Sequence, residues 1–305
     1  MKIVVAGGTG LIGKSLLNRL ISTGHKVTLL TRNPGIVNKG EIALHKLQWD
    51  GKTIGSWSES IDGAVAVINL CGENVASKRW TRDQKIKLLD SRIDPTRVLI
   101  KAISEAGKKP SLLINASAAG FYGNYGTGEV TEDDGKGDGF LADLCDKWEQ
   151  EGSCAEKYGT RVVFLRFGVV LDTSGGALKK MLPPFRMFVG GPLGTGKQWF
   201  SWIHCDDAVN VIHFALQNPQ VIGPINVVAP SPITMSEFAS SLGKLLERPS
   251  GLHVPSFILK LGLGEMSGML IGGRKIIPKK LLDNKFVFSY PDIDRALTSL
   301  LKKNH

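Results

Sequence analysis

Cysteine is scarce in this chain and follows no recognisable pattern. The four cysteines, Cys71, Cys145, Cys154 and Cys205, show neither the paired spacing of a metal site nor the density of a disulfide framework. We therefore expect a reducing compartment and no bound metal. An apolar run begins at residue 2, which leaves no room for a secretion signal and favours a cytoplasmic location.

Two further absences narrow the range of partners. The most apolar late stretch, residues 254–273, is interrupted by Lys260, Glu265 and several glycines, so it predicts no membrane-spanning helix. Basic residues outnumber acidic ones, 38 to 28, and give a net charge of +10, but they form no dense run and no aromatic-lined platform. We expect neither a membrane nor a nucleic acid as partner, because binding of an anionic cofactor is enough to account for the excess positive charge.

The composition, 42% hydrophobic and 22% charged, is that of an ordinary globular protein. Apolar runs alternate with helical patterns, which predicts an α/β fold with a doubly wound, Rossmann-like parallel sheet. We expect this sheet in residues 1–167 and a smaller α+β lobe in residues 168–305, with some later segments free to return to the first domain. The expected strands cover residues 2–6, 27–30, 64–70, 111–116, 161–167 and 225–228. The expected helices cover residues 11–23, 81–106 with a break at Pro95, 140–158, 206–217, 234–247 and 291–302.

A glycine-rich turn follows the first predicted strand. Residues 2–6 (KIVVA) run directly into residues 7–13 (GGTGLIG), which open the first predicted helix. In this motif the first glycine permits a tight turn, the second leaves room for phosphates, and the third lets the helix pack closely on the strand. The helix N-terminus also offers free N–H groups to negative charge. We predict that a dinucleotide is bound by Gly7, Thr9, Gly10, Leu11, Ile12 and Gly13.

The end of the second predicted strand indicates which dinucleotide binds. An NAD site carries an acidic residue about 20 residues beyond the glycines, where it receives the ribose hydroxyls. Here the strand ends in Thr31-Arg32-Asn33-Pro34, without a carboxylate. Thr31 can donate a hydrogen bond to a 2′-phosphate and Arg32 can pair with it, so we predict NADP(H). The alternative is that Arg32 is a surface arginine that happens to follow a strand.

Several blocks along nearly the whole chain resemble one family. They are residues 69–75 (NLCGENV), 79–81 (RWT), 91–92 (SR), 167–171 (FGVVL), 202–204 (WIH) with Asp207, 228–230 (VAP) and 273–279 (GRKIIPK). They resemble the atypical extended short-chain dehydrogenase/reductases called epimerase family proteins, also labelled nucleoside-diphosphate-sugar epimerases or SulA-like. The resemblance implies a Rossmann-like sheet, a small C-terminal lobe and NADP(H) as ligand.

The same resemblance implies that four more residues lie around the cofactor. They are Asn69, Leu70, Glu73 and Arg92. A turn at the carboxyl end of a strand lies in the crevice where ligands bind, which makes this placement physically reasonable. For Arg92, a solvated helix face is an equally good interpretation.

The catalytic residues of the broader superfamily are only partly present. Its members use a serine, a tyrosine, and a lysine four residues beyond the tyrosine, which lowers the tyrosine pKa for proton exchange. Ser117, directly after the predicted strand over residues 111–116, is in the right place for the serine. The helix that should carry the other two has Leu141 and Cys145 at those positions, and neither can exchange that proton.

Other side chains could supply the missing chemistry. Tyr122 lies five residues after Ser117 and could present its phenol to the same crevice, or could be a packing residue in a strand-end loop. Tyr125 is a weaker version of the same hypothesis. Cys145 is expected to be buried and unreactive, and Lys147 to point off another face of the helix.

Two later motifs favour structural interpretations. His204 with Asp206 and Asp207 could imitate an acid–base pair, but their position before a helical pattern favours a helix cap. Residues 190–197 (GGPLGTGK) lack the residue order of a phosphate loop, so they predict a turn that leads into a strand over residues 199–203.

Two functions remain open at this point. The first is an NADP(H)-dependent oxidoreductase or nucleotide-sugar epimerase, in which Ser117 and Tyr122 handle the substrate oxygen. The second is a catalytically silent NADP(H)-binding regulatory protein, which the missing tyrosine–lysine pair favours. The sequence names no substrate.

Overall fold

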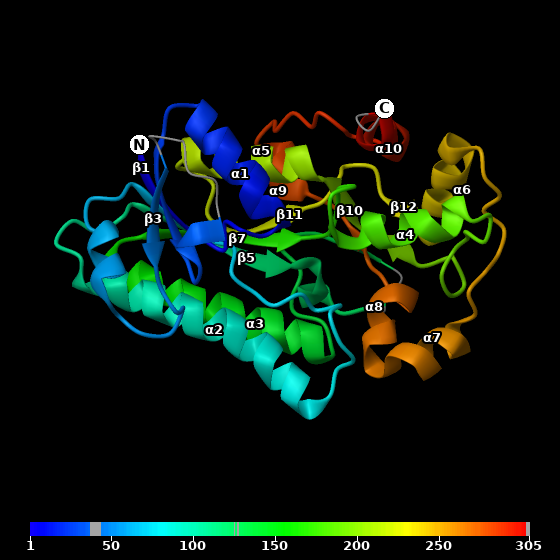
Figure 1. The fold of residues 1–305 in the computed structure, drawn as a ribbon, viewed down its shortest axis with the longest axis horizontal. Coiled ribbons are helices and arrows are strands. Elements are labelled where there is room, and N and C mark those ends of the chain that lie inside the picture. Colours follow the sequence, from blue (N-terminus) through cyan, green and yellow to red (C-terminus); the bar gives the residue numbers. More distant parts are fainter. Residues whose placement is uncertain (37–43, 125, 127, 303–305) are drawn as a thin grey trace.

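The structure is a computed structural model that describes residues 1–36, 44–124, 126 and 128–302. Within these ranges, seven parallel strands form one sheet in the order β11–β7–β5–β4–β1–β2–β3 (Figure 1). The strands are β1 (Lys2–Ala6), β2 (Lys26–Thr31), β3 (Leu44–Gln48), β4 (Ala66–Asn69), β5 (Leu112–Ala118), β7 (Arg161–Phe167) and β11 (Gly223–Val227). The predicted Rossmann-like α/β class is confirmed. The strand order reverses between β1 and β4, and ligands bind at such a reversal.

Helices cover both faces of the sheet, so its central strands are apolar on both sides. In β1, Ile3 and Val5 face one hydrophobic core, whereas Val4 and Ala6 face the other, and all four side chains are completely buried. The first core lies beneath α1 (Leu11–Ser22) and α5 (Cys205–Gln217), and the second beneath α2 (Arg82–Glu105). Figure 1 shows α1 and α5 on one side of the sheet, with α2 and α3 (Phe140–Ser153) on the other.

The predicted break at Pro95 is wrong. Helix α2 runs without interruption through this proline, although a proline inside a helix removes one backbone hydrogen bond and costs about 3 kcal/mol or more. The ring is buried against the turn at Gly51, and Thr96 Oγ1 donates to the Arg92 carbonyl, 2.7 Å away. Tertiary packing therefore holds the helix together where local propensity predicts a break.

Elements of the second half of the chain that lie outside the main sheet pack around a separate hydrophobic core, and we call them the C-terminal lobe. Phe238, Leu242, Trp202 and Leu297 are among its buried side chains. Its elements are β8 (Val169–Leu171), α4 (Gly176–Arg186), β9 (Trp199–Phe200), β10 (Trp202–His204), β12 (Ile233–Thr234), α6 (Met235–Leu246) and α10 (Ile293–Lys302). The single strand expected over residues 199–203 is thus two short strands, interrupted at Ser201.

The two halves are joined by segments far apart in the sequence. Strand β6 (Glu129–Val130), in the long connection after β5, pairs in parallel with β13 (Lys275–Ile276) near the C-terminus. The remaining helices are α7 (Ser256–Leu263), α8 (Gly268–Ile271), α9 (Lys279–Asp283) and the 3-10 helices η1 (Pro34–Ile36), η2 (Ser56–Ser60), η3 (Ala119–Tyr122), η4 (Cys154–Tyr158) and η5 (Gly264–Ser267). Across the described ranges, no helix is both long enough and apolar enough to cross a membrane.

Candidate functional site

The glycine-rich turn lies at the reversal of strand order, between β1 and α1. Gly7 has a φ of +77°, and a Cβ there would lie 2.5 Å from the Leu70 carbonyl carbon, in the turn after β4. A Cβ on Gly13 would lie 2.5 Å from the Gly8 Cα. Both contacts are with backbone, which cannot move aside cheaply, so the packing of the chain itself requires these two glycines.

Gly10 is different, because the protein does not require a glycine there. A Cβ on Gly10 would meet only the Gly7 carbonyl oxygen, at an ordinary contact distance of 3.5 Å. Gly10 is exposed and is the N-cap of α1, whose first turn has no acidic residue. The exposed backbone and the free N–H groups of this helix end fit a bound phosphate group. Of the other residues predicted here, Thr9 is exposed, and Leu11 and Ile12 are half-buried.

The two residues predicted to select NADP(H) have unlike surroundings. Thr31 is buried at the end of β2, and its Oγ1 accepts a hydrogen bond from the Asn33 N–H at 3.3 Å. Arg32 is exposed in the segment that follows β2. Burial raises the pKa of Cys71 to about 12, and the Arg32 charge opposes this shift. Because β2 and β4 are parallel, the segments that follow them lie at the same end of the sheet as the glycine turn.

Asn69 shapes the turn after β4 from inside the protein. It is fully buried, and its Nδ2 donates to Asn115 Oδ1 at 2.7 Å and to Thr96 Oγ1 at 2.9 Å. Its Oδ1 accepts from the Cys71 N–H at 3.1 Å. These bonds fix the backbone of residues 69–71, including Leu70 beside Gly7.

Arg92 is a buried cation at the same end of the sheet. It is 8% exposed, so the interpretation as a solvated helix face is wrong. Its guanidinium donates to the carbonyls of Leu88 at 2.8 Å and of Glu73 at 3.0 Å, and in the described part of the chain no carboxylate pairs with it. Burial lowers the pKa of Arg92, while nearby Cys145 and Glu73 oppose this shift. The Glu73 carboxylate instead accepts from Gln84 Nε2 at 3.1 Å.

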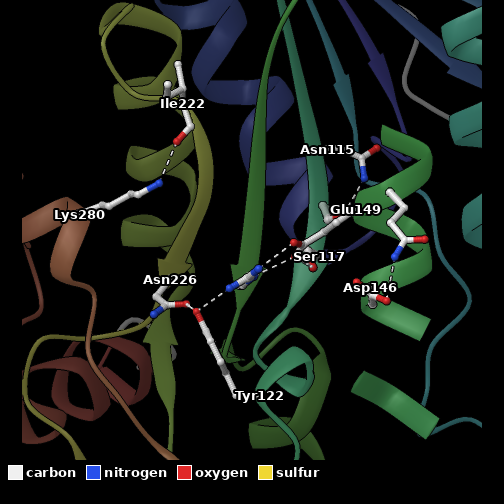
Figure 2. A network of polar contacts seen from close by, with 11 residues as sticks. Asn115, Ser117, Tyr122, Asp146, Glu149, Ile222, Asn226 and Lys280 are labelled. Carbon is white, nitrogen blue, oxygen red and sulfur yellow. Dashed lines mark hydrogen bonds and ion pairs between the residues drawn. The ribbon is translucent and has the colours of Figure 1, made fainter. Parts of the chain in front are cut away.

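Ser117 and Tyr122 belong to one buried polar network (Figure 2). Ser117 Oγ donates to Glu149 Oε1 at 2.6 Å, and both Glu149 oxygens accept from Arg166, at 2.9 and 2.8 Å. Arg166 also donates to the Tyr122 hydroxyl at 2.8 Å, and that hydroxyl donates to Asn226 Oδ1 at 2.7 Å. The structure thus brings the two candidate catalytic residues together through a carboxylate–guanidinium pair.

The network is closed to solvent. Ser117 is 3% exposed, Tyr122 2% and Arg166 3%. Burial raises the pKa of Tyr122 to about 12, with the Arg166 charge opposing. The phenol therefore stays protonated at neutral pH, and it is held between a donor and an acceptor.

Sequence reasoning missed Arg166, Glu149 and Asn226, although a signal was available. Arg166 is the one charged residue in the interior of the apolar run over residues 162–167, and a charge in a buried strand needs a partner. Asn226 is likewise polar between Ile225 and Val227. The sequence does not reveal which residues pair with Arg166 and Asn226, because each partner lies on a different helix or strand.

Helix α3 carries Leu141 and Cys145, which sequence reasoning places at the tyrosine and lysine positions of the superfamily. Leu141 lies against Gly120, where a Cβ would be 3.1 Å from the leucine Cβ. Cys145 is fully buried, and this burial raises its pKa to about 11, so the predicted unreactive thiol is supported. Lys147 is exposed on another helix face, as predicted. Tyr125 lies outside the described residues.

The two later motifs, residues 204–207 and residues 190–197, form the helix cap and the turn that the sequence predicts. His204 is the N-cap of α5, and its Nδ1 accepts from the Asp206 N–H at 3.0 Å, so the predicted cap is confirmed. Asp207 is buried and accepts from the N–H groups of Ser289 and Tyr290, both at 2.9 Å, which ties a late loop to α5. Residues 190–197 form a turn that leads into β9, as predicted.

The chain is similar to known proteins along its whole length. Residues 3–228 match the model of the NAD dependent epimerase/dehydratase family, and residues 254–300 match a domain of unknown function (DUF1731). It is 40% identical to the "Epimerase family protein SDR39U1 homolog, chloroplastic" of Arabidopsis thaliana, over 99% of this chain and 87% of that protein. It is 38% identical to the epimerase family protein YfhF of Bacillus subtilis, over 99% and 98%. The crystal structure of the human epimerase family protein SDR39U1 (isoform 2) with NADPH has a TM-score of 0.88 and 35% identity, over 99% of both chains.

Proposed function

Because this chain belongs to the NAD dependent epimerase/dehydratase family, we propose that it binds NADP(H) across residues 7–13 and acts on a small hydroxyl or carbonyl substrate. The reaction is an oxidation–reduction or an epimerisation. The human relative crystallised with NADPH supports this choice of cofactor, as does the resemblance to the atypical extended short-chain dehydrogenase/reductases.

The observation that carries the proposal is the contrast among the three glycines. Gly7 and Gly13 are required by the packing of the chain, whereas Gly10 has space for a Cβ and is exposed at a helix N-terminus. A residue that the fold does not require to be glycine is explained by a ligand that approaches its backbone. Thr9, Leu11 and Ile12 complete the phosphate side of this site, and Asn69, Leu70 and Glu73 border it.

The 2′-phosphate end of the site is assigned to Thr31 and Arg32. The exposed Arg32 pairs with the phosphate, and the Thr31 hydroxyl can donate to it. Arg92 adds a second positive charge near the turn after β4, and its guanidinium makes no ion pair with a carboxylate among the described residues. The bound nicotinamide supplies the hydride chemistry.

In this proposal Ser117 and Tyr122 handle the substrate oxygen. The Tyr122 hydroxyl has to exchange its bond to Asn226 for a bond to substrate, while Arg166 keeps its own bond to the phenol. The Arg166 guanidinium opposes part of the rise in the Tyr122 pKa that burial causes, because a positive charge beside a phenol favours its ionised form.

A second function is favoured by the closure of the same network. Both Ser117 and Tyr122 are buried and already hydrogen-bonded within the protein. A protein that binds NADP(H) without turning over a substrate needs no accessible proton donor. In that case the cofactor acts as a regulatory ligand.

One experiment separates the two functions. The purified protein is titrated with NADPH and NADH by fluorescence and then screened, with NADPH, against carbonyl compounds and nucleotide sugars. Turnover that is lost in Ser117→Ala and Tyr122→Phe supports catalysis. Tight NADPH binding without turnover supports the regulatory function, and failure to bind NADPH overturns both.

Tyr158→Phe is the matched control for Tyr122→Phe. Tyr158 is 40% exposed on η4, so its hydroxyl should be dispensable. Thermal unfolding of each variant shows whether a loss of turnover reflects a loss of folded protein.

For the choice of dinucleotide, Arg32→Ala should weaken NADPH binding more than NADH binding.

A further inference from the structure

Half of the exposed large apolar side chains lie in two neighbouring segments of the C-terminal lobe. Seven of the 14 that are exposed among the described residues fall there, and we call these seven the apolar strip. They are Met187, Phe188, Val189, Leu252, Phe257, Ile258 and Leu261. Exposed apolar side chains scattered singly need no explanation, but a concentration of them marks an interaction surface.

Helix α7 is the most unusual part of the strip. Its sequence is SFILKLGL, and none of its eight residues, all of which the structure describes, is buried. Phe257 is 69% exposed and Leu261, one turn later, is 79% exposed, so both lie on one side of the helix. A helix this apolar normally packs into a core, and here it is left on the surface.

The segments that carry the strip are physically joined. The backbone of Val254 donates to the Pro192 carbonyl at 3.1 Å, and its own carbonyl accepts from Gly194 at 2.9 Å. The Arg248 guanidinium lies 4.4 Å from the centre of the Phe188 ring. Figure 1 shows α6, α7 and their connection at the end of the molecule farthest from β3.

Basic residues outnumber acidic ones around the strip. Residues 173–205 contain Lys179, Lys180, Arg186 and Lys197 and no acidic residue. Residues 247–265 contain Arg248 and Lys260 together with Glu247 and Glu265, and the Glu265 carboxylate pairs with Lys85 Nζ, 2.5 Å away. Arg186, Lys197 and Lys260 are exposed. Two copies of such a surface would repel each other, which disfavours self-association, whereas an anionic surface would attract either copy.

From this combination we propose that the apolar strip docks the protein on an anionic lipid surface. Phe257 and Leu261 enter the boundary between headgroups and acyl chains, and the flanking lysines and arginines contact the lipid phosphates. No spanning helix is needed for this mode of binding. Such docking departs from the sequence-based expectation that no membrane is a partner: residues 254–273 are too interrupted to cross a bilayer, but α7 within them can lie on its surface.

The test is co-sedimentation of the full chain with vesicles. Vesicles of equal parts phosphatidylcholine and phosphatidylglycerol are compared with vesicles of phosphatidylcholine alone, at about 0.1 M and about 1 M salt. We expect binding to the anionic vesicles that weakens at high salt, and little binding to the neutral ones. Absence of binding to the anionic vesicles at low salt would overturn the proposal.

The variant Phe257→Ser/Leu261→Ser tests whether the strip is responsible. It should lower the vesicle partition coefficient about tenfold or more, because two side chains no longer leave water. Val287→Ser is the control: Val287 is 83% exposed but lies outside the strip, so binding should not change. Equal binding of the double variant and the native chain would show that charge alone attracts the protein, and would refute the strip as the docking surface. A concentration-dependent dimer that the double variant abolishes, without vesicle binding, would identify a second copy as the occupant instead.

Discussion

At the scale of single residues, three of the four glycines in residues 7–13 meet three different constraints. Gly7 needs a positive φ, Gly13 needs room for the Gly8 backbone, and Gly10 is left free by the protein. Substitution therefore separates folding from ligand binding within one short segment.

Gly10→Ala should weaken NADPH binding about tenfold or more, which corresponds to about 1.4 kcal/mol, because its methyl group occupies the space where the phosphates approach. Its unfolding temperature should change little, since the new Cβ meets only one protein atom, at 3.5 Å. Gly13→Ala is the contrasting variant and should unfold at a lower temperature. Equal NADPH affinity of Gly10→Ala and the native chain would argue against this site.

Glu149 and Arg166 form the buried ion pair at the centre of the polar network, where their side chains are 11% and 4% exposed. Glu149→Gln should lower the free energy of unfolding by about 3–5 kcal/mol, because it leaves a buried guanidinium without its counter-charge. The matched substitution Glu151→Gln removes the surface pair with Arg97, which is 62% exposed, and should cost at most about 1 kcal/mol. Urea denaturation measures both, and similar losses in the two variants would refute a special role for the buried pair.

At the scale of elements, the ends and the interiors of helices are determined by different interactions. The ends follow local chemistry: Thr81 caps α2, His204 caps α5, and Thr234 with Glu237 forms a capping box at α6. The interior of α2 follows tertiary packing, which carries the helix through Pro95. Local signals therefore predict where these helices begin better than where they break.

Thr234→Ala should destabilise the C-terminal lobe by about 1 kcal/mol, because it removes the acceptor of the Glu237 N–H. Ser240→Ala is the control, since Ser240 is an exposed hydroxyl in the middle of the same helix. This control should be neutral or slightly stabilising, because alanine has the higher helix propensity. Thermal unfolding measures both, and a loss in Ser240→Ala as large as that in Thr234→Ala would contradict the capping role.

At the scale of the whole molecule, polar contacts connect the main sheet to the C-terminal segment. Beyond the Tyr122–Asn226 bond, the Asn226 N–H donates to Glu132 Oε1 at 2.9 Å, and the Lys280 N–H donates to Glu132 Oε2 at 3.2 Å. Glu132 is 6% exposed and lies just after β6, which pairs with β13. One buried carboxylate thus joins β11, the connection after β5 and the start of α9.

Burial raises the pKa of Glu132 above its ordinary value of 4.5, and the backbone donors oppose this shift. A raised pKa means that the folded state favours the protonated form, so this contribution to stability is complete below about pH 4.5 and is lost as pH rises through the folded-state pKa. The stability of the native chain relative to Glu132→Gln should therefore be greater near pH 4.5 than at pH 7. The native chain and the variant have all other titratable groups in common. Urea denaturation of both at the two pH values therefore measures how the contribution of position 132 to stability depends on pH. A difference that is constant, or that grows with pH, would contradict the raised pKa.

The class of fold and the position of the glycine turn could be predicted from the sequence because they depend on local patterns. Apolar runs, glycine spacing and helix-cap residues act over a few neighbours, and they identified the six strands expected for the main sheet together with the missing tyrosine–lysine pair. The strand over residues 44–48 was not predicted, because Leu44 and Leu47 are its only apolar residues and are too few to form an apolar run.

What the sequence determined by itself is therefore the alternation of strands and helices, the turn between β1 and α1, and the loss of the usual catalytic pair. Only the tertiary structure decided that Arg92 is buried, that α2 continues through Pro95, and that Ser117 and Tyr122 share one network. Its members come from β5, η3, α3, β7 and β11, up to 109 positions apart in the sequence. Contacts over such separations depend on which strands the crossovers place side by side, and on which side chains are then excluded from water together.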